Sequence, residues 1–137
     1  MRSIQITGRN LGGVKEFLES LDLPANIARK MPSITTALSN AIDNLAESES
    51  SLVSSLGGTI GSDGSIDFTE AEDTEQAVSE FVKQREDMLD NDKFIITESV
   101  AGSLDTLYAG FLSNWNGIVP KHLVAAYNEL MDALEAE

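Results

Sequence analysis

The sequence predicts a mainly α-helical fold, a bundle of about five helices with a small β-hairpin and one short strand pair. Three observations predict it. Over most of the chain, apolar residues recur at the three- and four-residue spacing of amphipathic helices. Glycine and proline interrupt this spacing at intervals typical of helix ends. In two other short stretches, β-branched residues alternate with polar residues or follow one another directly, which favours strands.

Residues 3–7 alternate isoleucine with polar residues and predict a short strand. Asn10 is then a candidate N-cap for a first helix over residues 11–21. Gly12 and Gly13 weaken this helix by about 1 kcal/mol each relative to alanine. Its apolar positions share one face: Val14, Phe17, Leu18 and Leu21.

Pro24 suits the first turn of a short second helix, because that position needs no backbone N–H. Pro32 then kinks or breaks the helix, and Ser33 can cap the next one. A helix of about six turns follows and ends at Gly57 and Gly58. Its apolar positions are Ile34, Ala37, Leu38, Ala41, Ile42, Leu45, Leu52, Val53 and Leu56.

Residues 59–68 predict a β-hairpin inserted between two helices. Asp63-Gly64 is typical of a type I′ turn. Thr69 and Asp73 each begin a capping-box spacing, and either can start the next helix. The expected inner face of that helix consists of Val78, Phe81, Val82 and Leu89, with Met88 beside it.

Residues 94–96 are aromatic and β-branched but too few for a helix, so they predict a strand whose partner is residues 4–6. Short connections between the helices favour antiparallel packing. The chain contains no repeat and no second unit of its own composition. We therefore expect one domain over residues 1–137, and the sequence leaves open whether residues 1–10 are flexible.

Ser99 or Ser103 can cap the following helix, whose apolar stripe runs to Trp115. Trp115 either closes the end of the bundle or anchors an interface, a role that tryptophan often has. After a loop over residues 114–117, Pro120 opens the last helix. The inner positions of that helix are Leu123, Val124, Tyr127, Leu130, Met131 and Leu134.

The net charge is −14, and it is unevenly distributed. Residues 63–92 hold eleven acids against two bases, Lys83 and Arg85. Nucleic acids and anionic membranes are bound through basic residues, so this composition excludes direct binding to either. The acidic stretch makes the protein soluble, and it also fits a basic protein partner attracted electrostatically.

No apolar run approaches the roughly 20 residues of a membrane-spanning helix. The N-terminal segment lacks the apolar core of a signal peptide. The sequence also contains no cysteine, which rules out disulfides. These features predict a cytoplasmic protein.

The sequence offers few catalytic groups. It has one histidine, His122, on which any Ser-His-acid arrangement would depend. It has neither a glycine-rich phosphate loop nor a histidine or cysteine cluster with zinc spacing. We therefore expect a protein that is not an enzyme, with no catalytic residue and no cofactor.

A weak candidate metal site lies in the hairpin. Asp63, Asp67 and Glu70 match the second half of a calcium-binding EF-hand loop. Positions one and three of that loop would be Thr59 and Gly61, which supply no carboxylate. Because calcium affinity depends on the number of charged ligands, a structural turn is the favoured interpretation.

Several motifs follow one another along the chain: a kinked helix ending at Gly57-Gly58, the run Asp63-Gly64-Ser65-Ile66-Asp67-Phe68, an acidic helix ending at Met88-Leu89, the strand Phe94-Ile95-Ile96 and a helix with Tyr127-x-x-Leu130. In this order, the chain resembles a family of small acidic proteins of unknown function encoded by phages and prophages of Gram-positive bacteria. The resemblance covers roughly residues 11–135 and implies a viral accessory protein, without supplying catalytic residues.

We therefore expect a phage-type accessory protein that binds a protein partner, from the host or the virion, through an acidic helical surface, with homo-oligomers left open. The candidate binding residues are Glu72, Asp73, Glu80, Asp87 and Trp115. One alternative is an acidic inhibitor that mimics nucleic acid and blocks a nucleic-acid-binding host protein. A small hydrolase is the third hypothesis, and it has the least support.

Overall fold

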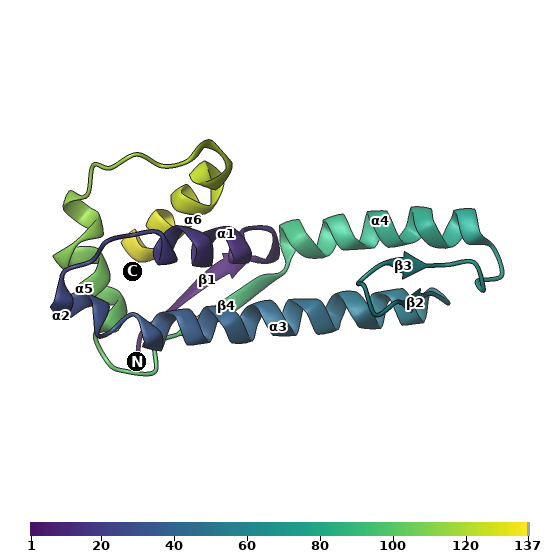
Figure 1. The fold of residues 1–137 in the computed structure, drawn as a ribbon, viewed down its shortest axis with the longest axis horizontal. Helices are drawn as coiled ribbons and strands as arrows, with labels where there is room; N and C mark the ends of the chain where they lie inside the picture. The colour runs from purple at the N-terminus through teal and green to yellow at the C-terminus, as the bar shows by residue number, and fades with distance from the viewer. Residues whose placement is uncertain (137) are drawn as a thin grey trace.

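Two strands far apart in the sequence pair in the computed structural model, which describes residues 1–136 (Figure 1). β1 (Ser3–Thr7) runs antiparallel to β4 (Lys93–Thr97), with Ile4 opposite Ile96. This confirms the predicted strand pair. Ile4 and Ile6 are buried, so β1 forms part of the hydrophobic core rather than a flexible tail.

Helices pack around this strand pair and form what we call the head, residues 1–45 and 89–136. Its core contains nineteen buried apolar residues from all of these elements. The helices of the head are α1 (Gly8–Glu19), α2 (Ala25–Ala28), the first part of α3 (Pro32–Ser55), α5 (Ser103–Gly110) and α6 (Val124–Glu135), with 3-10 turns at Leu112–Asn114 and Lys121–Leu123.

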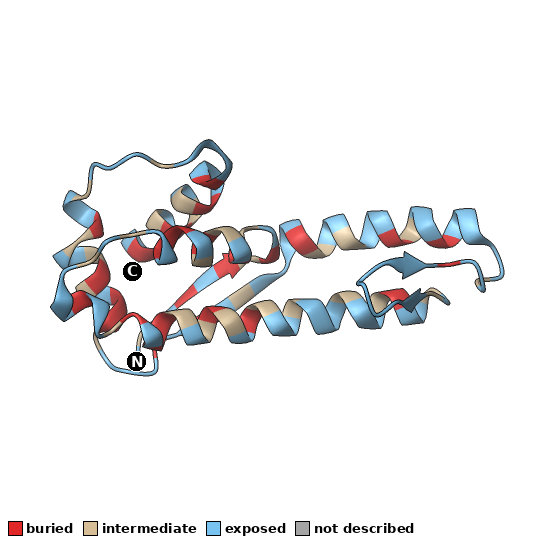
Figure 2. Cartoon of the chain, viewed as in Figure 1, coloured by how far each residue is buried: buried red, intermediate tan, exposed pale blue. Residues whose placement is uncertain are grey.

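The second half of α3 leaves the head, and α4 (Thr74–Asn91) returns alongside it (Figure 1). We call residues 46–88 the arm. Between the two helices lies a small antiparallel hairpin of β2 (Thr59–Ile60) and β3 (Ile66–Asp67). At 1.5 Å per residue, the 24 residues of α3 span about 36 Å. The arm is therefore a long projection with most of its surface in solvent (Figure 2).

The predicted fold class is confirmed, since the described residues are mainly helical and carry the hairpin and the strand pair. The predicted end of α3 is also confirmed. Gly57, which follows the C-cap residue Leu56, has a φ of +82°, a left-handed conformation that glycine adopts at little cost.

The predicted start of the first helix is wrong. α1 begins at Gly8, directly after β1, and Thr7 rather than Asn10 precedes it. The carboxylate of Glu129, on α6, accepts hydrogen bonds from the Thr7 N–H at 2.6 Å and from the Asn10 side chain at 3.0 Å. A group 122 positions away therefore replaces the local cap.

The type I′ turn predicted at Asp63-Gly64 is also wrong, because that turn needs positive φ at both residues. Gly64 has a φ of +84°, whereas Asp63 keeps a negative φ. The Asp63 carboxylate instead accepts hydrogen bonds from the Ser65 N–H at 3.1 Å and from its hydroxyl at 2.7 Å. This local bond stabilises a longer loop between β2 and β3.

Helix starts were predicted with mixed success. Of the two capping-box candidates before α4, Asp73 is the N-cap, and its carboxylate accepts a hydrogen bond from the Gln76 N–H at 3.1 Å. α3 begins at Pro32, so Ser33 lies inside the first turn. α5 is capped by Gly102 and the Glu98 carboxylate rather than by Ser99 or Ser103.

Gly12 and Gly13, which the sequence predicts to weaken the first helix, differ in their surroundings. A Cβ added at Gly13 would lie 2.8 Å from the Cβ of Ala126 on α6, whereas one added at Gly12 would meet nothing within 4 Å. Gly13 therefore allows α1 and α6 to approach closely.

We expect Gly12→Ala to stabilise the protein by about 1 kcal/mol through helix propensity. Gly13→Ala should instead destabilise it by about 1 kcal/mol, because overpacking outweighs the same gain. The midpoints of urea unfolding of the two variants measure the difference. Equal stabilisation by both would contradict the close contact between α1 and α6.

Candidate interaction surface

The arm has a small hydrophobic core of its own near its free end. Val53 on α3, Phe68 after β3, and Ala77 and Phe81 on α4 are buried there. The rings of Phe68 and Phe81 lie 5.6 Å apart between centroids. Gly58 makes room for this contact, since a Cβ at that position would come within 2.6 Å of the Phe68 ring. The hairpin thus fills the space between the two helices.

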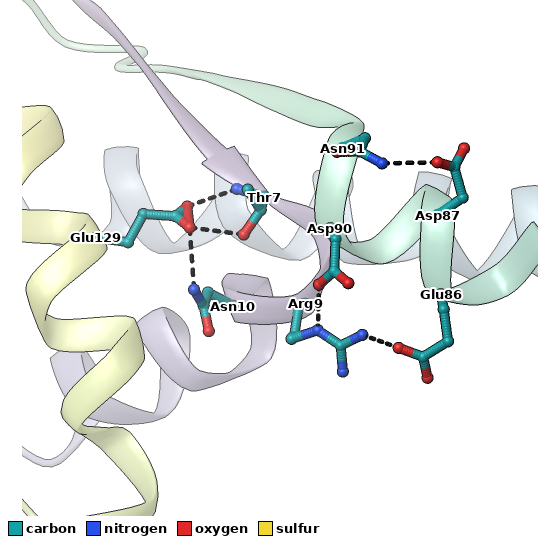
Figure 3. A network of polar contacts seen from close by, with 8 residues as sticks. All are labelled: Thr7, Arg9, Asn10, Glu86, Asp87, Asp90, Asn91 and Glu129. Atoms are coloured by element: carbon teal, nitrogen blue, oxygen red, sulfur yellow. Dashed lines mark hydrogen bonds and ion pairs between the residues drawn. The ribbon is translucent and has the colours of Figure 1, made fainter.

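Ion pairs connect the arm to itself and to the head. Within the arm, the Arg85 guanidinium lies 3.4 Å from the Glu49 carboxylate. At the base, Arg9 of α1 donates hydrogen bonds to Asp90 and Glu86 of α4 (Figure 3). Arg9 thereby joins α1 of the head to the C-terminal end of α4, where the chain returns from the arm to the head.

The pKa values at this base follow from the same contacts. Hydrogen bonds to Asp90 and then to Glu86 raise the pKa of the Arg9 guanidinium above its ordinary value. The hydrogen bond from Arg9 lowers the pKa of Asp90. Arg9 and Asp90 therefore both stay charged around neutral pH.

Negative charge is concentrated on the arm. Residues 46–88 hold eleven acids and two bases, net −9, while the other 94 residues hold twelve acids and seven bases, net −5. In the part of the chain that the structure describes, bases pair with two of the eleven acids, Glu49 and Glu86. Most carboxylates of the arm therefore face solvent without a counter-charge.

Aliphatic side chains are exposed among these acids. Val78 and Val82 of α4 are 44% and 53% exposed, and Ile60 and Ile66 of the hairpin are 44% and 42% exposed. Val78 and Val82 lie one turn apart, and Ile60 and Ile66 face each other across the two strands. The arm thus presents apolar contacts inside an acidic surface.

The prediction that Val78 and Val82 face inward is wrong. Ala77 and Phe81 occupy the inner face, and a one-residue step turns a side chain about 100° round the helix. The arm core is narrow, so it covers only that one row. Val124, predicted to face inward on α6, is likewise exposed at 43%.

Four of the predicted binding residues lie on the arm: Glu72, Asp73, Glu80 and Asp87. Asp73 also caps α4. Glu80 accepts a hydrogen bond from Gln84 at 2.7 Å, and Asp87 accepts one from Asn91 at 2.6 Å. These are contacts within one helix, which leave the carboxylates exposed or half-buried and available to a partner.

Trp115 does not join these acids. It belongs to the head, where its ring packs edge-on against Phe17 at 5.5 Å and lies 6.0 Å from the ring of Tyr127. It is half-buried against the main core. The structure therefore favours the interpretation that Trp115 closes the core over the interpretation that it anchors an interface.

The weak metal candidate lies on the arm as well. Asp63 and Asp67 accept hydrogen bonds from Ser65 and Thr69, and these bonds lower the pKa of both carboxyls. Each carboxylate therefore closes its own turn, and Glu70 is exposed nearby in the sequence. Among residues 1–136, no three histidine or acidic side chains come together as metal ligands would.

His122 lies on the surface of the head. Its Nε2 is 3.0 Å from the carboxylate of Glu16 on α1, and both side chains are more than half exposed. No serine hydroxyl is recorded in a hydrogen bond to it within the described part of the chain. This pair is an exposed contact between the start of the last helical segment and α1.

No family model, no curated protein and no solved structure matches the chain. Within residues 1–136, no helix combines the length and the apolar character needed to cross a membrane.

Proposed function

We propose that this protein is a non-enzymatic binding protein, a phage-type accessory protein in the host cytoplasm, whose arm docks on a basic surface of a protein partner. One observation supports the proposal above all others. A projecting arm carries net −9, and exposed aliphatic side chains lie among its unpaired carboxylates. Apolar contacts surrounded by charge are typical of protein interfaces.

The charge also indicates what the arm does not contact directly. Nucleic acid would be repelled, because its binding depends on neutralising phosphates with lysine and arginine. The arms of two separate copies would also repel each other, because both carry a net negative charge. A basic protein surface satisfies both the charge and the aliphatic contacts, and attraction at a distance would speed its association.

The test compares two variants of equal charge change. In the first, Glu72, Glu75, Glu80 and Asp87 on the arm are replaced by lysine, and the helix cap Asp73 is left in place. In the control, Glu16, Glu19, Asp22 and Asp43 outside the arm are replaced by lysine. Proteins captured from expressing cells by the wild type and by the control should be lost from the arm variant.

Docking through the arm would be contradicted if the arm variant and the control both lost the captured proteins, or if both retained them. Salt gives a second measurement. Binding of the captured partner should weaken when ionic strength rises from 0.05 to about 0.5 M, because exposed charges are screened over a shorter distance.

A second candidate, a nucleic-acid mimic, has one observation in its favour. The 18 residues of α4 extend about 27 Å, a length over which duplex DNA carries about 16 charges. The eleven acids and two bases of the arm, net −9, are spread over its two helices and the hairpin, so the arm carries roughly half the charge of that length of duplex. If the captured partner binds DNA or RNA, competition between the arm and that nucleic acid would favour mimicry, and independent binding would exclude it.

A further inference from the structure

The outer edge of β1 is a separate feature of the head. At one end of the strand pair, the Glu98 N–H donates to the Arg2 carbonyl at 3.2 Å, and at the other end the Gly8 N–H donates to the Asp92 carbonyl at 3.3 Å. In an antiparallel pair, bonded positions alternate along each strand. The backbone groups of Ile4 and Ile6 therefore bond to β4, and those of Ser3, Gln5 and Thr7 point away from it.

The position of Thr7 shows where this edge faces. Thr7 belongs to the outward row, and its N–H donates to the Glu129 carboxylate of α6 at 2.6 Å. Ser3 and Gln5 belong to the same row. Within residues 1–136, no hydrogen bond outside the strand ladder uses the N–H groups or the carbonyls of these two residues. Four backbone groups of β1 thus face the α6 side without a protein partner.

A cavity of about 870 Å³, which we call the groove, lies between this edge and α6. Binding cavities for ligands span roughly 300–1,000 Å³, so the space is large enough for a short extended segment. Ala133 is small and leaves room on the helix side. The residues of α6 and its C-terminal end that line the cavity are Glu129, Asp132, Ala133, Leu134, Glu135 and Ala136.

Hydrogen bonds at both ends fix the position of β1 relative to α6, and these two elements form the walls of the groove. Arg2 donates hydrogen bonds to the carbonyls of Leu134 and Ala136 at the end of α6. Glu129 connects α6 to Thr7 and Asn10 at the other end (Figure 3). The groove is therefore formed before a ligand binds, which lowers the entropic cost of binding.

The charges around the groove favour a basic ligand. Its acids are Asp105, Glu129, Asp132 and Glu135, and its bases are Arg2 and Lys93. Arg2 is neutralised by Asp105 at 2.7 Å. Asp132 is exposed, and within residues 1–136 no base pairs with it. A negative excess therefore remains beside the free edge of β1.

We propose that this groove receives an extended, basic segment of a partner protein, which adds to β1 as a third strand. The four unpaired backbone groups of Ser3 and Gln5 would bond to the segment, and Asp132 would pair with a lysine or arginine of it. Sheet edges often bind peptides in this way. The groove belongs to the head, so this inference does not rest on docking through the arm.

The probe is a blocked five-residue peptide of alternating valine and lysine, with the matched valine and glutamate peptide as control. We expect the lysine peptide to slow amide hydrogen exchange at Gln5 about tenfold at saturation, while the glutamate peptide has no effect. Protection confined to other amides, or equal protection by both peptides, would overturn the proposal.

Two variant pairs test the contact itself. Gln5→Pro removes the outward N–H but keeps the ladder to β4, since proline is tolerated on that side of an edge strand. Gln5→Ala keeps the N–H. Ala133→Leu fills the groove, and Ala125→Leu adds the same volume on an exposed position of α6. Binding should survive in Gln5→Ala and Ala125→Leu and be lost in the other two.

Two further outcomes complete the test. Retained binding in Gln5→Pro and Ala133→Leu, in protein with unchanged circular dichroism, would overturn the site. Protection of Gln5 that rises with protein concentration in the absence of peptide would show that a second copy occupies the edge, which also overturns the proposal. The arm variant with four lysines should bind the peptide as the wild type does, so failure of one proposal leaves the other measurable.

Discussion

Replacing Phe81 with alanine should unfold the arm and leave the head folded. A buried phenylalanine truncated to alanine costs about 3–5 kcal/mol. The core of the arm has four buried residues, Phe81 among them, whereas the core of the head has nineteen others. The core of the head does not extend into the arm, so it cannot replace the contacts of Phe81. The lost free energy should therefore destabilise the arm alone.

Amide hydrogen exchange measures this effect residue by residue. Amides of residues 46–88 should exchange rapidly in Phe81→Ala, while those of β1, β4 and α1 keep their protection. Of the 78 α-helical residues within residues 1–136, the arm holds 25, ten in α3 and fifteen in α4, so helical circular dichroism should fall by up to a third.

Val82→Ala is the matched control, since Val82 lies on the same helix and is exposed at 53%. It should change exchange in the arm little, because few buried contacts are removed. Simultaneous loss of protection in the arm and in the head of Phe81→Ala would mean that the two unfold as one unit. That result would contradict an arm with its own core.

The elements of the fold were predictable where local patterns decide them. The spacing of apolar residues located α3, α4 and α6, and the β-branched residues located both strands of the pair. Helix length, however, says nothing about which half of a helix has a neighbour. The second half of α3 has the same apolar spacing as the first, yet only the first half lies in the head.

The caps and ion pairs that fix the fold were not predictable, because they join distant positions. Arg2 contacts the end of α6 across 132 positions, and Glu129 contacts Thr7 across 122. Nothing local marks these residues as caps. The acidity of the candidate surface was visible in the sequence, but its concentration on a projecting arm depends on how α3 and α4 are placed.

Glu98 is the clearest case of a structural residue that the sequence did not single out. Its side chain is 2% exposed, and its carboxylate accepts backbone N–H groups from Arg2 at 3.0 Å, Gly102 at 2.9 Å and Leu104 at 2.8 Å. It thereby joins the first residues of the chain to the start of α5. Glu98→Ala leaves three buried donors without a partner and should cost about 2–4 kcal/mol.

The same contacts predict a pH dependence. Burial raises the pKa of Glu98, but the hydrogen bonds from Leu104, Arg2 and Gly102 and the positive charge of the N-terminus together outweigh it, so the pKa lies below the ordinary value of 4.5. The folded protein then binds this proton less readily than the unfolded chain. The contribution of Glu98 to stability is therefore complete above about pH 4.5 and disappears as the pH falls through the lowered pKa.

Glu98→Gln isolates this contribution, because glutamine keeps the shape of the side chain but offers one acceptor oxygen in place of two. The difference in free energy of unfolding between wild type and Glu98→Gln should be constant from pH 6 to 8 and shrink below about pH 4.5. Glu72→Gln, on the exposed surface of the arm, should show no such change. A difference that is independent of pH down to the acid transition would mean that Glu98 acts through packing alone, and that the charge of its carboxylate does not stabilise the junction between β1 and α5.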